Sequence, residues 1–163
     1  MTDNTTPAVS NENAVAAEAQ PNFVLTRSYL KDLSLELPHA PQIFLENGDP
    51  ATDMDLSVTY QMLDTGFYEV AVKVTVKTEI NGKTLFLVEG TQGGIFRVDH
   101  IPLDQIEPLM RIMGAGIVYP YLRANIADAV TRTGFPAVHL SEVNFQSFFE
   151  AQLAEEAANA TKH

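Results

Sequence analysis

Two short runs of the chain carry acidic side chains at the spacing of a β-strand. Asp32, Ser34 and Glu36 alternate with leucines, and Leu87 and Glu89 stand two positions apart in a second run. Because side chains alternate across a strand, each run directs its members to one side of a sheet. Acidic groups around an apolar centre suit the docking of a basic protein surface. A solvated sheet face with an incidental leucine explains the same pattern equally well.

Catalytic and metal-binding signatures are missing from the sequence. The four histidines lack metal-ligand spacing, and there is no cysteine. Asp53 and Asp55 share one side of a strand, but nothing else converges on them to hold a cation or act as an acid pair. The segment Gln92 to Ile95 superficially resembles a phosphate loop without its lysine or helix, so we interpret it as a bulge or kink in a long strand. We expect no enzyme activity, metal or cofactor.

The charge balance of the chain is strongly acidic. Among 163 residues, 21 Asp and Glu stand against 10 Lys and Arg, which gives a formal net charge of -11. Such a surface repels phosphate backbones, so nucleic acid is not an expected partner, and it favours basic partners and solubility. The N-terminus lacks the pattern of a secretory signal, and no apolar stretch is long enough to span a membrane. We therefore expect a cytoplasmic protein without direct membrane insertion.

Four strands with a period of two are expected to position the acidic runs. They cover about Phe23 to Leu37, Met54 to Met62, Phe67 to Ile80, and Leu85 to Val98. Turn sequences at residues 64–66 and 81–82 join the last three strands as hairpins. The pattern predicts a four-stranded antiparallel meander in which the third strand pairs with the second and the fourth.

The fourth strand is apolar on both sides at its start. Alternation places Leu85, Leu87 and Glu89 on one side, and Phe86 and Val88 on the other. A sheet with two apolar faces must cover both, or it leaves one for a partner.

A helical period follows the sheet. Asp104 can cap a helix that reaches about Thr133, and Pro120 is expected to kink it. Gly114 and Gly116 offer a smooth surface where a second copy of the helix could approach; an ordinary helix lying on the sheet is the alternative. The predicted fold class is α+β, with this long kinked helix followed by a shorter C-terminal helix.

The shorter helix is expected to begin after Ser141, as its N-cap, and to carry the apolar stripe Phe145, Phe148, Phe149 and Leu153. The chain is thus divided into a disordered tail at residues 1–22, one domain at residues 23–153, and a flexible acidic tail at residues 154–163.

Several separate segments resemble the SecB family of protein-export chaperones, in matching order and without gaps. The likeness covers about Phe23 to Leu153. The segments that carry it are Tyr29–Glu36, Pro38–Pro41, Phe67–Val70, Val74–Val76, Gln92–Phe96, Tyr119–Arg123, Gly134–Pro136 and Val143–Phe145. The chain departs from the family at Gly48, where the family has a tryptophan, and at Gly90, where it has a bulkier apolar residue.

The resemblance implies a homotetramer, built as a dimer of dimers, that holds unfolded precursor proteins in an export-competent state without ATP. It also implies delivery of these clients to the SecA translocation motor, which has a basic zinc-binding tail. An acidic oligomeric adaptor that binds folded protein partners remains the alternative. Retarded refolding of an unrelated unfolded chain would separate the two.

The resemblance further implies roles for particular residues. The SecA-binding positions are Asp32, Glu36, Leu87 and Glu89. The client-binding positions, which would line a groove, are Phe44, Met54, Leu56, Phe86, Val88, Phe149 and Leu153. The oligomer-interface positions are Gly114, Gly116, Tyr119, Val88, Gly90 and Gln92, with the long helix at the seam between dimers.

Overall fold

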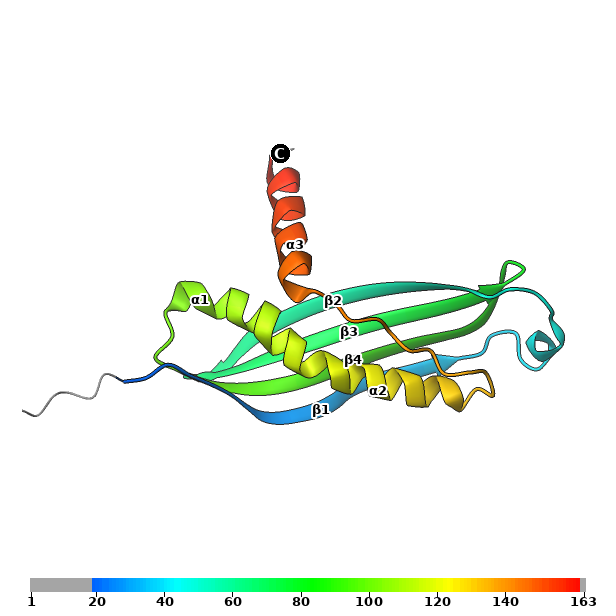
Figure 1. The fold of residues 1–163 in the computed structure, drawn as a ribbon, viewed down its shortest axis with the longest axis horizontal. Helices are drawn as coiled ribbons and strands as arrows, with labels where there is room; N and C mark the ends of the chain where they lie inside the picture. Colours follow the sequence, from blue (N-terminus) through cyan, green and yellow to red (C-terminus); the bar gives the residue numbers. More distant parts are fainter. Residues whose placement is uncertain (1–18, 162–163) are drawn as a thin grey trace, which may run out of the picture.

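An antiparallel sheet of four strands carries a long helix across one face, and a second helix projects away from this layer (Figure 1). The computed structural model describes residues 19–161, so residues 1–18 of the predicted N-terminal tail lie outside the described residues. The strands are β1 (Asn22–Glu36), β2 (Ala51–Asp64), β3 (Phe67–Ile80) and β4 (Lys83–Asp99). The helical segments are the 3-10 helix η1 (Gln42–Leu45), α1 (Leu103–Pro108), the π-helix η2 (Leu109–Gly114), α2 (Ala115–Thr131) and α3 (Phe145–Ala160). The predicted α+β class is confirmed.

The strands are ordered β1-β4-β3-β2 in the sheet. β3 pairs with β2 and β4 as predicted; the turn between β3 and β4 uses Asn81 and Gly82, both with the positive φ that a two-residue hairpin requires. β1 lies beside β4, whereas a simple meander would place it beside β2. Its connection to β2, residues 37–50, holds three prolines and η1 and so does not close a tight hairpin. β1 and β2 are therefore the two edges of this sheet.

β4 departs from the predicted alternation at its beginning. The β3–β4 register shifts by one residue beside Thr78, and Leu85 is the extra residue of a bulge. Leu85 is buried and does not continue the row formed by Leu87 and Glu89, which corrects the expectation that all three share one side.

The glycine-rich segment from Gln92 to Ile95 is regular strand, which corrects its interpretation as a bulge. The β3–β4 register runs unbroken through it, and the irregularities lie opposite, in β1. The glycines permit close approach instead. A Cβ on Gly93 would lie 2.5 Å from the ring of Tyr29, and one on Gly94 would lie 2.5 Å from Val118 of α2. Strand and helix can therefore pack backbone to side chain at Gly94.

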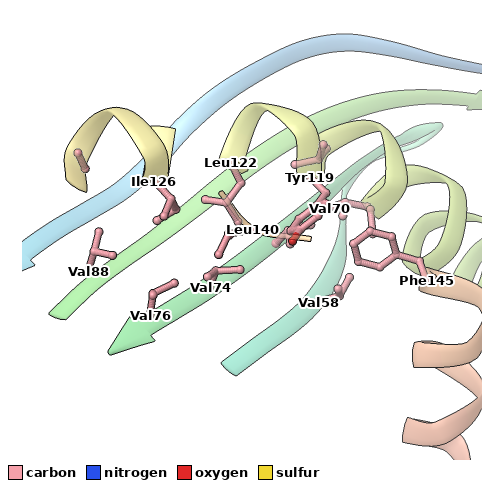
Figure 2. Packing of buried hydrophobic residues seen from close by; sticks show 14 of the residues in the cluster. Val58, Val70, Val74, Val76, Val88, Tyr119, Leu122, Ile126, Leu140 and Phe145 are labelled. Atoms are coloured by element: carbon pink, nitrogen blue, oxygen red, sulfur yellow. The ribbon is translucent and has the colours of Figure 1, made fainter. Parts of the chain in front are cut away.

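The hydrophobic core lies between the sheet and α2. One side of β3 presents the fully buried residues Val70, Val72, Val74 and Val76. Leu122 and Ile126 of α2 cover them, and Figure 2 shows Ile126 above Val88 of β4. Burial of one such side chain stabilises the fold by about 1.5–3 kcal/mol. We call this helix-covered side of the sheet the inner face.

The long helix begins earlier than predicted and contains an irregularity that was not predicted. Pro102 occupies the N-cap position without a side-chain bond, and Asp104 lies in the first turn, where its charge interacts favourably with the helix dipole. The π-helix η2 interrupts the α-helical pattern before Pro120, which lies within α2. Helical structure ends at Thr131, two residues before the expected end.

α3 begins after Asn144, not Ser141. The Asn144 side chain accepts a hydrogen bond from the backbone N of Ser147 at 3.1 Å, which makes it the N-cap. A segment at residues 134–144 returns from α2 across the sheet before α3 rises away from it (Figure 1). α3 extends to Ala160 and so includes residues 154–160 of the predicted C-terminal tail.

Candidate functional site

The four predicted SecA-binding residues meet on the side of the sheet opposite α2, which we call the outer face. Paired residues of antiparallel strands point to the same side. Glu36 pairs with Leu87, and Ser34 pairs with Glu89. Asp32 stands two positions before Ser34 and shares its side. The register thus assembles residues from both acidic runs of the sequence on one surface.

β3 contributes basic and hydroxyl side chains to the same outer face. Thr75 pairs with Glu89, and Lys77 pairs with Leu87. Nζ of Lys73 lies 2.9 Å from Oε1 of Glu89, and Oγ1 of Thr75 donates to Oε2 of Glu89 at 3.0 Å. The hydrogen bond from Lys73, followed by that from Thr75, holds the pKa of the Glu89 carboxyl below its usual value. This carboxylate is ionised at neutral pH and already has two partners.

Asp32 and Glu36 differ from Glu89 in their partners. Both are exposed, and within residues 19–161 neither takes part in an ion pair. Leu87 lies half-buried between them and the basic side chains of β3. The outer face therefore combines free carboxylates with an apolar centre, an arrangement that can bind a basic protein segment.

A further carboxylate of the outer face, that of Glu69, is closed off from solvent. Glu69 of β3 is only 4% exposed. Its Oε1 accepts hydrogen bonds from the Tyr29 hydroxyl and from Nζ of Lys31, the latter at 2.8 Å, and its Oε2 accepts one from Gln61. Burial raises the pKa of Glu69, but the hydrogen bonds from Lys31, Tyr29 and Gln61 outweigh it and leave the pKa below its usual value. Burial, with the bond to Glu69, raises the pKa of Tyr29 to about 12.

Five of the seven predicted client-binding residues occupy one end of the molecule, near η1. In the inner-face register, Met54 and Leu56 of β2 lie in the same rows as Val76 and Val74, and Val88 continues the Met54 row. The two remaining members at this end, Phe44 and Phe86, are linked by a row of aromatic contacts.

The aromatic contacts connect the loop after β1 to the sheet. Phe44 of η1 stacks on Phe135, with ring centroids 5.0 Å apart. The ring centroid of Phe135 in turn lies 6.2 Å from that of Phe86 of β4. Phe44 is exposed, whereas Phe86 and Val88 are buried in the core. Only part of the predicted client-binding set is therefore exposed in this chain, and Phe86 and Val88 belong to the core.

The other two predicted client-binding residues lie apart from this end, on α3. Phe149 is buried against Arg111 of η2, whose guanidinium carbon lies 5.2 Å from the ring centroid. Arg111 also bonds to Glu107 and to Gln152, so it fastens α3 to the long helix. Leu153, one turn further along α3, is exposed.

Most of the predicted oligomer-interface residues are packed within the chain itself. Gly90 and Gly114 lie close to side chains of α2 and β3, respectively. Gln92 is buried, and its side chain bonds to Ser28 and to Asn125.

Tyr119 is also internal, since it is buried and its hydroxyl donates to the backbone oxygen of Ser141 at 2.9 Å. Gly116 alone among the predicted interface positions is exposed. It lies on the outward side of the long helix with exposed Met113, Ile117 and Tyr121, which form an apolar surface there.

Sequence reasoning missed two groups of residues. The first is Lys73 and Thr75 of β3, which lie on the outer face and contact Glu89 of β4. The second is a set of exposed apolar residues on the inner side of the edge strand β2, namely Met54, Tyr60 and Met62, with half-buried Leu56 and buried Val58 between them. The alternation of apolar residues in the second predicted strand indicates which of them share one side. It does not indicate that this strand lies at an edge of the sheet, where such residues stay exposed.

Within residues 19–161, no group of three or more His, Cys, Asp or Glu side chains is placed to hold a metal ion. No helix in that range has the length and apolar character needed to cross a membrane.

These observations define an α+β protein whose sheet is covered by helices on one face and presents an accessible charged surface on the other. The chain belongs to the SecB family: the family described as "Preprotein translocase subunit SecB" matches residues 16–156. The "Protein-export protein SecB" of Bordetella pertussis is 52% identical over 145 residues, which cover 89% of this chain and 83% of that protein. The protein of the same name from Acidovorax sp. is 50% identical over 145 residues, covering 89% and 97%.

A solved structure shares the fold. It is described as the Mycobacterium tuberculosis Rv1957 SecB-like chaperone in complex with a ChAD peptide from the Rv1956 HigA1 antitoxin. The TM-score is 0.63 at 12% sequence identity, over 74% of this chain and 90% of that chain. At this identity the likeness concerns the architecture alone.

Proposed function

We propose that this protein is an ATP-independent export chaperone of the cytoplasm, which holds unfolded precursor proteins as a homotetramer and delivers them to the SecA motor. The observation that carries the proposal is the outer-face register. It assembles Asp32, Glu36, Leu87 and Glu89 on one accessible surface, although they come from two separate acidic runs. Membership of the SecB family supports the same reading.

The docking step uses charge and an apolar centre together. The net charge of -11 attracts a basic segment of the motor, and Asp32 and Glu36 supply carboxylates without competing ion pairs among the described residues. Leu87 gives the contact an apolar component that salt does not screen. Docking is therefore expected to weaken at high salt more than the holding of apolar clients does.

The holding step uses exposed apolar side chains beside a free strand edge. Met54 is 40% exposed on β2, an edge of the described sheet, and Leu153 of α3 is 43% exposed. An extended client can bury its side chains against such residues at about 25 cal/mol per Å² and pair its backbone with the strand edge. Methionine and phenylalanine adapt to many shapes, so client choice is expected to be broad.

The holding function is tested by the rate at which an unrelated denatured protein refolds in the presence of the chaperone. We expect Met54→Ser with Leu153→Ser to weaken holding by roughly tenfold, since two apolar contacts are lost. Val24→Ser is a matched control, because Val24 is 48% exposed but lies on the opposite edge strand. Unimpeded refolding with the unaltered protein at every ratio would reject the holding function.

The docking function is tested by calorimetric titration of SecA into the tetramer. Asp32→Lys with Glu89→Lys should lower the affinity at least about tenfold while holding persists, since two of the three carboxylates of the proposed surface are reversed in charge. Native mass spectrometry should give four times the 17.9 kDa of one chain for the unaltered and the altered protein. Equal loss of docking and holding would contradict the assignment of these residues.

A further inference from the structure

The outer face contains a cation of its own beside the acidic residues of β1 and β4. Lys73 pairs across the β3–β4 register with Thr91, which pairs in turn with Asp32 of β1. Its ammonium group lies 2.9 Å from Oε1 of Glu89. Lys73 therefore occupies the place that a basic side chain of a docking partner would take.

Each oxygen of the Glu89 carboxylate already accepts a hydrogen bond from a side chain of β3. Lys73 bonds to Oε1, and Thr75 donates to Oε2. A cationic partner that binds Glu89 must displace the Lys73 ammonium or accept a shared, like-charge environment beside it. The displaced ammonium does not lose all its stabilisation, because the Lys73 side chain is 46% exposed and water can solvate the charge.

We propose that Lys73 is a built-in competitor for Glu89, which sets the affinity and the selectivity of the docking surface. This inference rests on the proposed docking of the basic SecA tail to the outer face. A single weak cation gains little by replacing one ammonium with another. A segment that engages Glu89 together with Asp32 and Leu87 gains the additional contacts and still binds, so Lys73 discriminates against incidental basic proteins.

Lys77 supplies a matched control on the same strand and the same face. Its ammonium lies 2.7 Å from a carboxylate oxygen of Glu79, which is not one of the docking residues. Lys77 and Lys73 have nearly equal exposure, 47% and 46%. Lys77→Met and Lys73→Met therefore change the net charge equally, and only the second frees Glu89.

The experiment measures the dissociation constant of the full-length protein for purified SecA and for a peptide of its basic zinc-binding tail, at physiological salt. We expect Lys73→Met to tighten binding two- to fivefold more than Lys77→Met, the fold-change that corresponds to roughly one exposed ion pair. In a Glu89→Gln background, Lys73→Met should give no gain beyond that of Lys77→Met, because the competed carboxylate is gone.

Three outcomes would overturn the inference. Equal gains for the two lysine variants would mean that only long-range charge matters. Weaker binding of Lys73→Met would mean that Lys73 contacts the partner favourably. An undiminished gain in the Glu89→Gln background would mean that Lys73 does not act through Glu89.

The same titrations separate this inference from the proposed function. When the unaltered protein binds SecA, and Glu89→Gln weakens that binding, docking on the outer face stands whatever Lys73→Met does. When neither SecA nor its peptide binds the unaltered protein, the docking proposal and the inference built on it both fall.

Discussion

Glu69 and Glu89 are two carboxylates on the same face of neighbouring strands, yet they differ in what surrounds them. The Glu69 side chain is 5% exposed and that of Glu89 is 33% exposed. The ring of Tyr29 lies over Gly93 and reaches Glu69 from the edge strand, so the carboxylate is covered. No aromatic side chain of the described residues bonds to Glu89 in this way.

The difference shows that sequence position on an acidic face does not by itself make a docking residue. A covered carboxylate with three donors cannot be offered to a partner without breaking its own network. An exposed carboxylate that shares one ammonium can exchange it for another at small cost. Glu69 is therefore expected to stabilise the fold, and Glu89 to serve binding.

Removal of the covered carboxylate should have the largest effect. Glu69→Ala leaves the Tyr29 hydroxyl and the Gln61 amide without their acceptor, so we expect the free energy of unfolding to fall by about 2–4 kcal/mol. Denaturant unfolding followed by circular dichroism measures this loss. Glu89→Ala is the matched control, with an expected loss below about 0.5 kcal/mol. Equal losses for the two variants would erase the distinction drawn between them.

The cover over Glu69 can be removed without touching the carboxylate. Gly93→Ala would place a Cβ 2.5 Å from the Tyr29 ring and force the ring away from Glu69. We expect a loss of roughly 1–3 kcal/mol in unfolding free energy from the displaced ring. Combining Gly93→Ala with Tyr29→Ala should cost little more than Tyr29→Ala alone, because the clash has gone. Full additivity in this double-mutant cycle would show that Gly93 has another role.

The strands and the fold class follow from sequence because the pattern of buried residues is strong. The alternation of Val70, Val72, Val74 and Val76 gave β3 its bounds, Phe67–Ile80, and the turn at Asn81-Gly82 fixed its hairpin with β4. The helix boundaries were less accurate. Cap positions depend on one side chain, and Asn144 supplied the bond that Ser141 was expected to make.

Which side of the sheet each β4 residue faces depends on the bulge at Leu85, and the hairpin turn taken alone predicts the opposite side. If the pairing that starts at this two-residue turn continued without a bulge, Lys73 would pair with Gly90. Val74 of the core would then pair with Glu89. The bulge at Leu85 shifts the register by one and turns every later side chain to the opposite side. The sequence contains the signal, since Val76 and Val88 can share the core only if one extra residue is inserted in β4.

The cover over Glu69 could not be predicted from sequence. Tyr29 and Lys31 belong to β1, and Glu69 belongs to β3, and they meet across β4 only because β1 lies beside β4. Local alternation determines which side a residue faces, but not which strands are neighbours. The strand order depends instead on the long crossing connection at residues 37–50.

The two carboxylates should also differ in how they respond to acid. The lowered pKa of Glu69 means that the unfolded chain binds a proton before the folded chain does as pH falls. Its contribution to stability is present above the usual value of 4.5 and is lost as pH drops through the folded pKa below it. We expect Glu69→Gln to flatten the fall in stability below pH 4.5, measured by urea unfolding at several pH values. An unchanged slope would show that Glu69 does not titrate with unfolding.

The smallest expected stability effect is that of neutralising the exposed carboxylate. Glu89→Gln keeps the size of the side chain and its hydrogen bond with Thr75, and it removes only an exposed ion pair with Lys73. The unfolding free energy should therefore change by less than about 0.5 kcal/mol. SecA affinity, measured on the same sample, should nevertheless fall, whereas Glu69→Gln should alter stability more than affinity. If Glu89→Gln and Glu69→Gln each changed stability and affinity in the same proportion, the distinction between a covered and an available carboxylate would be wrong.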